Sequence, residues 1–167
     1  MTKSAYIIGA PGSGKSTLMG EMLDGWEVGP YVRFTGREMF GHYLTKFDDA
    51  HIAAYLGHLR PEFPGTDALS LSVAPQALLW VDSLPLLGLD QVFGEGVRLS
   101  HIGFLMALAE VTDLTVIYLE VNPEVAAQRR LARGGKMLSD NYCKIATSRA
   151  ANVAAACQDA GIRVEIR

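Results

Sequence analysis

The chain has 167 residues, of which 49% are hydrophobic and 20% charged, and its formal net charge is −3 at pH 7. This composition excludes intrinsic disorder and predicts a single globular domain over residues 1–167. The weakly negative net charge gives no overall attraction to nucleic acid or anionic lipid, although a local basic groove would still attract phosphate groups.

The N-terminal part begins with a strand, a helix and a second strand. Ala5–Gly9 is apolar without alternation, as expected for a strand covered on both faces. The pattern then predicts a helix over Lys15–Asp24, ended by Gly25. Glu27–Phe34 is predicted as a strand, although Gly29-Pro30 interrupts it.

The middle of the chain combines helical patterns with one irregular segment. Apolar residues in Glu38–Leu59 recur at helical spacing, which predicts two short helices. Arg60–Asp67 contains two prolines and a glycine, and it is therefore expected to form a loop. Such loops often carry function on an α/β scaffold. Val73–Leu87 is predicted to be a helix with Pro75 in its first turn.

Strands and helices alternate in the C-terminal half. The predicted elements are a strand at Gln91–Gly94, a helix at Leu99–Val111, a strand at Leu114–Val121, a helix from Asn122 to Arg133, a helix at Asp140–Ala160 and a strand at Ile162–Ile166. This alternation predicts a three-layer α/β fold, with a parallel sheet of about five strands and helices on both faces.

Cysteine usage and hydropathy indicate the cellular setting. Cys143 and Cys157 fall in one predicted helix about 21 Å apart, too far to bond to each other. No apolar run approaches the about 20 residues that a membrane-spanning helix needs. We therefore expect a soluble protein of a reducing, cytoplasmic compartment, with no membrane partner.

The most informative motif lies between the first strand and the first helix. It has the spacing of a phosphate-binding loop: a glycine, four residues, then Gly-Lys-Ser. Glycines let successive backbone N–H groups point at one centre, the lysine reaches the β and γ phosphates, and the serine hydroxyl binds magnesium. The alternative is a glycine-rich turn without function. We expect ATP, or another nucleoside triphosphate, with Mg²⁺ to bind here, through Gly9, Ala10, Pro11, Gly12, Ser13, Gly14, Lys15, Ser16 and Thr17.

A cluster of arginines favours a kinase among the proteins that use such loops. Arg129, Arg130 and Arg133 have the spacing that gathers them on one side of a helix end, and Gly134-Gly135 follows as a hinge. Mobile cations of this kind cover a transferred phosphate and exclude water. We expect a lid at about residues 129–139, with Arg129 also binding the nucleotide. The alternative is a solvated basic face.

The segment Tyr118–Glu124, followed by Arg129 and Arg133, is similar to the strand, helix and lid of the thymidylate-kinase-like nucleotide kinases. Within that group, Gly65–Ser70 and Phe93–Leu99 resemble the phage hydroxymethyluracil-DNA kinases. The resemblance implies Mg-ATP-dependent transfer to the hydroxymethyl group of a base in DNA, as a step of hypermodification, in a host cytoplasm. The related kinases often carry an acid where this chain has Val97.

Further site residues follow from the loops and strand ends. We expect Lys15, Asp67, Arg129 and Arg133 to be catalytic, with Asp67 as general base because it is an acid in an accessible loop. The resemblance implies that Glu95 assists Ser16 at the magnesium ion. The alternatives are Asp67 as a helix N-cap and Glu95 as an ordinary turn acid. Candidate substrate-binding residues are Arg37, Arg60, Thr66, Asp67 and Arg98, with Phe34, Tyr55 and Phe63 as candidates for base stacking.

Two other functions compete with a DNA-base kinase. The same fold could phosphorylate a free nucleoside monophosphate, which the acidic net charge favours. A nucleotide-gated regulatory protein without transfer activity is the third possibility, and the arginine cluster argues against it.

Overall fold

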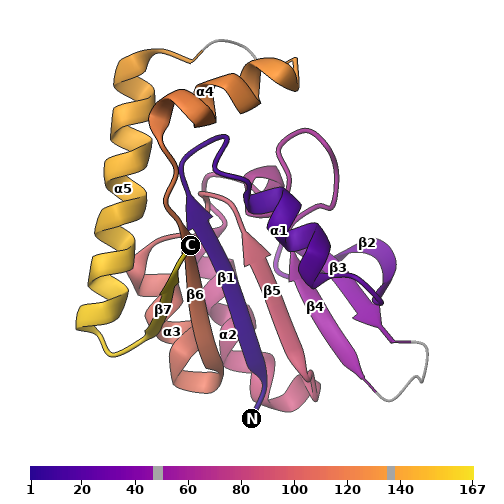
Figure 1. Cartoon of the computed structure of the whole chain (residues 1–167). Helices are drawn as coiled ribbons and strands as arrows, with labels where there is room; N and C mark the ends of the chain where they lie inside the picture. Colours follow the sequence, from indigo (N-terminus) through magenta and orange to yellow (C-terminus); the bar gives the residue numbers. More distant parts are fainter. Residues whose placement is uncertain (47–50, 135–137) are drawn as a thin grey trace.

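The computed structural model describes residues 1–46, 51–134 and 138–167. Its elements form one seven-stranded sheet in the order β2-β3-β4-β5-β1-β6-β7, with helices packed against it (Figure 1). In chain order they are β1 (Lys3–Gly9), α1 (Lys15–Met22), β2 (Glu27–Thr35), β3 (Met39–Thr45), β4 (Ile52–Leu56), the 3-10 helix η1 (Thr66–Ala68), α2 (Ala74–Leu87), β5 (Gln91–Glu95), α3 (Ile102–Val111), β6 (Asp113–Leu119), α4 (Pro123–Ala132), α5 (Asp140–Asp159) and β7 (Arg163–Ile166).

The sheet combines a parallel core with an antiparallel edge. Strands β4, β5, β1, β6 and β7 pair in parallel, whereas β3 pairs antiparallel with both β4 and β2. The expected α/β class is therefore confirmed, and the sheet, which we expected to be parallel, is mostly so. The expected number of about five strands is wrong, because β2 and β3 extend the sheet to seven.

The two helices expected within Glu38–Leu59 are strands β3 and β4 in the structure. Nearly every residue of these strands is shielded from solvent, since α1 and α2 cover opposite faces. A strand buried on both faces loses its period of two, and its apolar residues then mimic helical spacing. Residues 47–50 of the predicted helical segment lie outside the described residues.

Apolar residues on both faces of the sheet make a three-layer core. One cluster packs α2, α3 and α5 against the sheet, with Trp80, Phe104 and Ala154 among its buried members. The other packs Met19 of α1 and Leu23, which follows this helix, against β1, β3, β4, β5 and β6. Figure 1 shows α1 in front of the sheet and α4 crossing near the carboxyl ends of the parallel strands. In open α/β sheets, ligands bind at this end.

The last three helices begin and end close to the expected positions. Asn122 caps α4 by accepting a hydrogen bond from the Glu124 N–H, and Ser139 caps α5 in the same way. Both cysteines lie on α5 and are free. Among the described residues, no helix is long and apolar enough to cross a membrane.

Candidate active site

The segment Gly9–Thr17 joins β1 to α1 and contains a tight turn, in which the Ser13 N–H donates to the carbonyl oxygen of Ala10. Gly12 and Gly14 have φ angles of 83° and 97°, in the left-handed region that favours glycine. A Cβ on Gly12 would lie 2.4 Å from the carbonyl oxygen of Ala126 in α4, so the loop tolerates no side chain there. The buried Oγ of Ser13 has no hydrogen-bond partner within the part of the chain that the structure describes. These features fit a loop built to present N–H groups to phosphate.

Lys15 lies folded onto this loop. Its Nζ donates hydrogen bonds to the carbonyl oxygens of Gly9, at 2.9 Å, and Ala10, at 3.0 Å. Burial lowers the pKa of the Lys15 ammonium, while the negative charges of Asp67 and Glu95 act in the opposite direction. A cation held this way is positioned to turn from the two carbonyls toward a phosphate.

Glu95, at the end of β5, forms the floor of the site. Its Oε2 accepts a hydrogen bond from the Ser16 hydroxyl at 3.1 Å, and its Oε1 accepts one from Tyr55 at 2.9 Å. Burial raises the pKa of Glu95, whereas the bonds from Tyr55 and Ser16 and the charge of Lys15 lower it. A hydroxyl and a carboxylate in contact are oxygen ligands of the kind that Mg²⁺ takes beside nucleotide phosphates. The residues present therefore fit a magnesium–nucleotide complex.

Asp67 is held by the loop that follows β5. It lies in η1, and its Oδ1 accepts a hydrogen bond of 2.6 Å from the backbone N–H of Val97. The N-cap of α2 is Val73, without a side-chain cap, so Asp67 does not cap that helix. The backbone N–H of Val97 thus orients the carboxylate of Asp67.

The neighbouring Thr66 has a structural position. It is fully buried, and its hydroxyl donates to the carbonyl oxygen of Glu95 at 2.9 Å and hydrogen bonds to the Tyr6 hydroxyl at 3.0 Å. Burial raises the pKa of Tyr6, which keeps this phenol neutral. The side chains of Thr66 and Tyr6 and the backbone carbonyl of Glu95 join η1 to the end of β5 and so bring Asp67 beside Glu95.

A cavity of about 490 Å³ lies over these residues. Ten of the expected site residues line it: Pro11, Gly12, Gly14, Lys15, Ser16, Thr17, Arg60, Asp67, Glu95 and Arg133. Pro61, Pro64 and Gly96 complete the lining. Two arginines that we expected to bind substrate, Arg37 and Arg98, do not line this cavity. Arg37 is exposed beside Gln76, which accepts its backbone N–H, and the Nε of Arg98 donates to the carbonyl oxygen of Leu69 at 3.3 Å.

The arginines of α4 contact the phosphate-binding loop. Arg130 donates to the carbonyl oxygen of Pro11 at 2.7 Å, and Arg133 to the Thr17 hydroxyl at 3.2 Å. The Arg129 guanidinium lies 3.7 Å from where a Cβ on Gly14 would be. The cluster therefore faces the loop and is not only a solvated surface. Residues 135–137 of the expected lid lie outside the described residues.

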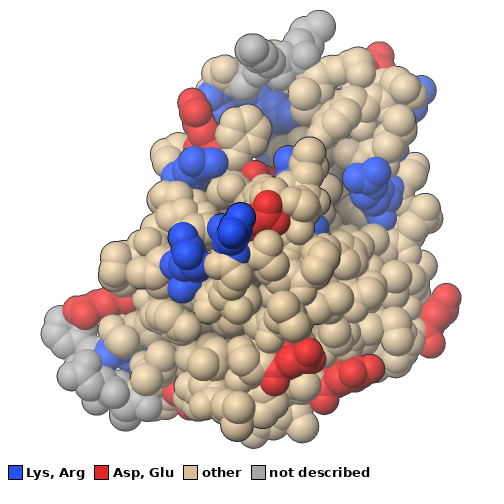
Figure 2. Space-filling model, turned by 180° about the vertical axis from the view of Figure 1, so that it is seen from behind, with Lys and Arg blue, Asp and Glu red and all other residues tan. Residues whose placement is uncertain are grey.

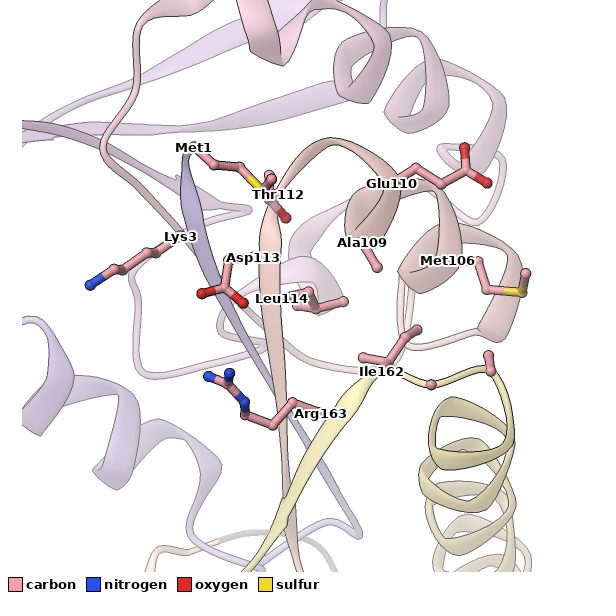
Figure 3. A pocket seen from close by; sticks show the side chains of 12 residues that line it. Met1, Lys3, Met106, Ala109, Glu110, Thr112, Asp113, Leu114, Ile162 and Arg163 are labelled. Carbon is pink, nitrogen blue, oxygen red and sulfur yellow. The ribbon is translucent and has the colours of Figure 1, made fainter.

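A larger hollow, of about 840 Å³, lies at the opposite end of the strands. Figure 3 shows its lining, with Asp113 between Lys3 and Arg163 and with Met106 and Leu114 among the apolar side chains. It contains neither the glycine loop nor a carboxylate–hydroxyl pair of the kind formed by Glu95 and Ser16. We therefore place the chemistry at the carboxyl end of the sheet.

Comparison with protein families agrees with this geometry. The model of the family described as P-loop Nucleotide Kinase3 matches residues 1–166. The chain belongs to this family. A comparison with curated proteins finds no match. The matched residues include the phosphate-binding loop. Nucleotide kinases transfer a phosphoryl group from a nucleoside triphosphate with Mg²⁺.

Three features of the kinase site could not be read from the sequence. Tyr55 was a candidate for base stacking, but it is fully buried and supports Glu95 instead. Phe34 packs on Trp80, with ring centroids 5.2 Å apart. The backbone donor at Val97 carries no sequence signal at all. Only Phe63 of the three aromatic candidates is strongly exposed, at 67%.

Proposed function

We propose that this kinase transfers the γ-phosphoryl group of Mg-ATP to the hydroxymethyl group of hydroxymethyluracil in DNA. The main support is that the two segments resembling hydroxymethyluracil-DNA kinases meet at the cavity. Gly65–Ser70 and Phe93–Leu99 are joined by the hydrogen bonds from Val97 to Asp67 and from Thr66 to Glu95. They are far apart in the sequence, and together they provide the acidic wall of the cavity.

The transfer step assigns a task to each side chain. The hydroxymethyl oxygen forms a bond to the γ-phosphorus while the bond from that phosphorus to the β–γ bridging oxygen breaks, and ADP leaves. Asp67 accepts the hydroxyl proton. Lys15 and Arg133 neutralise charge on the transferred group, and Ser16 and Glu95 hold the magnesium ion, which when bound neutralises phosphate charge.

The distribution of charge supports a polyanionic acceptor despite the negative net charge. Cations gather at the carboxyl end of the parallel strands, where Lys15, Arg60 and Arg133 line the cavity. The amino end carries both signs of charge, with Asp90 directly before β5 and with Asp113, Lys3 and Arg163 at the starts of β6, β1 and β7. Figure 2 shows most of the Lys and Arg side chains of the rear face over its upper and middle parts, with acidic side chains among them and along the lower border. Local potential of this kind attracts DNA.

A free nucleoside monophosphate is the alternative acceptor, which the net charge of −3 favours. Such an acceptor requires no extended cationic surface, and its binding would depend much less on salt.

Transfer of labelled γ-phosphate from ATP tests the proposal. The acceptors are hydroxymethyluracil-containing DNA, the same DNA with thymine, and a set of free deoxynucleotides. We expect label only in the modified DNA, with a steep loss of DNA affinity as salt rises. Label in a free nucleotide, with none in modified DNA, would establish the alternative acceptor.

A further inference from the structure

Phe63 has an unusual position for an apolar residue. Its side chain is 67% exposed, and its φ angle is 48°. Among the described residues it is the one non-glycine with positive φ. Such a conformation costs free energy for a bulky residue, and residues of this kind cluster at functional sites. The strain therefore holds an aromatic ring in solvent and does not bring it into the core.

The loop that carries Phe63 is anchored firmly at its base. His58 and Gly65 exchange two backbone hydrogen bonds, of 3.1 and 2.9 Å. The His58 ring stacks on Tyr31, with centroids 4.1 Å apart. The Leu59 N–H donates to Nε2 of His42 at 3.3 Å, which ties the loop to β3. Anchoring of this kind pre-organises the exposed tip for binding.

The same loop forms one wall of the catalytic cavity. Arg60, Pro61 and Pro64 line the cavity on either side of Phe63. Both prolines restrict the backbone and so limit where the intervening ring can go. Phe63 thus projects into solvent from the wall of the cavity, next to the exposed cation Arg60.

The groups that we assign to the transfer lie inside the cavity. Glu95 is 1% exposed, and Asp67 is held against Val97 beside it. A base within a duplex is flanked by its neighbours and its partner strand, so it must leave the stack to enter such a cavity. The gap that it leaves can be filled by an apolar side chain, which offsets the cost of unstacking.

We propose that Phe63 inserts into the DNA base stack beside the acceptor base and occupies the gap when that base turns into the cavity. Arg60 contacts a backbone phosphate next to this gap. The inference rests on the proposed function, and it adds double-stranded DNA as a substrate together with the residue that opens it. Phe63 is a positioning residue, because it contacts neighbouring bases and not the reacting atoms.

The test compares one hydroxymethyluracil oligonucleotide as a single strand and as a duplex. We expect Phe63→Ala to lower kcat/KM on the duplex by about 10-fold or more and to change the single-strand value only a few-fold. Only the duplex leaves a gap between stacked bases, so only there does the variant lose the contact between the Phe63 ring and the neighbouring bases. Phe63→Trp should retain most duplex activity. Leu86→Ala, which truncates an exposed apolar side chain near the far end of α2, is the matched control and should leave both values unchanged.

A direct readout uses 2-aminopurine opposite the acceptor base, whose fluorescence rises when its partner leaves the stack. The wild-type protein and Phe63→Trp should raise this fluorescence, and Phe63→Ala should not. Equal loss on single strand and duplex, or an unchanged fluorescence rise in Phe63→Ala, would overturn the role of Phe63 while leaving the proposed function in place. Absence of wild-type transfer to both DNA forms would remove the proposed function and this inference with it.

Discussion

Replacing Tyr55 with phenylalanine keeps the aromatic ring and removes the hydroxyl that donates a hydrogen bond to Glu95, the carboxylate that we propose binds magnesium. Tyr55 is fully buried, and burial raises its pKa, so its phenol is a neutral donor to Oε1 of Glu95 at 2.9 Å. Ser16 is the other side-chain donor to this carboxylate. The substitution therefore weakens the support of Glu95 without deleting a group that contacts substrate.

The size of the effect follows from the bond that is lost. A hydrogen bond to a charged group contributes about 1.5–3 kcal/mol, which corresponds to roughly 10–150-fold in an equilibrium constant. Loss of an outer partner of a metal ligand typically costs about 10–100-fold in metal affinity or activity. We therefore expect the magnesium concentration for half-maximal transfer to rise by about 10–100-fold, and kcat at saturating magnesium to fall only a few-fold.

The pH dependence has a definite sign. Burial raises the pKa of Glu95 and the Tyr55 hydrogen bond lowers it, so the variant raises this pKa further. Magnesium binds the deprotonated carboxylate. The increase in the magnesium concentration needed by Tyr55→Phe should therefore be larger at about pH 6 than at about pH 8. Magnesium titrations of transfer at both pH values measure this. Tyr43→Phe, on the neighbouring strand, is the matched control. An unchanged magnesium requirement at both pH values would refute the role given to Tyr55 and Glu95.

Three further substitutions test other parts of the site. Asp67→Asn can keep the hydrogen bond from Val97. It should lower kcat by about 10²–10⁴-fold, while fluorescence titration should still show nucleotide binding. Retention of transfer within a few-fold would exclude Asp67 as the base. Lys15→Met removes a cation whose attraction to a phosphate charge about 4 Å away, in a medium of intermediate polarity, is about 4 kcal/mol. The rate of single-turnover transfer should therefore fall roughly 10³-fold, and full activity would contradict the kinase site. Gly12→Ala places a Cβ against the α4 backbone and should abolish nucleotide binding in calorimetry, whereas Gly20→Ala, whose Cβ meets nothing within 4 Å, should bind normally; equal binding by both would contradict the close packing of the loop.

Strands β1, β5, β6 and β7 of the parallel core could be predicted because their signals are local. Caps at Asn122 and Ser139 define where α4 and α5 begin, and the β-branched run of β6 defines a strand. Strands β3 and β4 could not be predicted in the same way. Burial of β3 and β4 on both faces removed the alternation that distinguishes a strand from a helix. Gly29-Pro30, which interrupts the pattern of β2, lies at a register shift between Val28 and Tyr31.

The contacts within the site were predictable only where a motif fixes the backbone. The sequence places Lys15 and Ser16 in the phosphate-binding loop, and Glu95 at a strand end opposite it. In the structure Ser16 and Glu95 hydrogen bond, while their joint role in holding magnesium stays a prediction. Tyr55 and the Val97 N–H come from segments whose contacts depend on tertiary packing. No local pattern encodes such partners: the register of β4 against β5 sets the distance from Tyr55 to Glu95, and the packing of η1 against the segment after β5 sets the distance from Asp67 to Val97.

The position of the transferred phosphate tests the central claim most directly. Hydroxymethyluracil-containing DNA is incubated with the protein and Mg-ATP, digested to nucleosides without removing phosphate from the base, and analysed by mass spectrometry. The account predicts hydroxymethyldeoxyuridine phosphorylated on its hydroxymethyl oxygen, and no such product from Lys15→Met. Phosphate found on the 5′ end of the DNA, or only on a free nucleotide, would contradict the account.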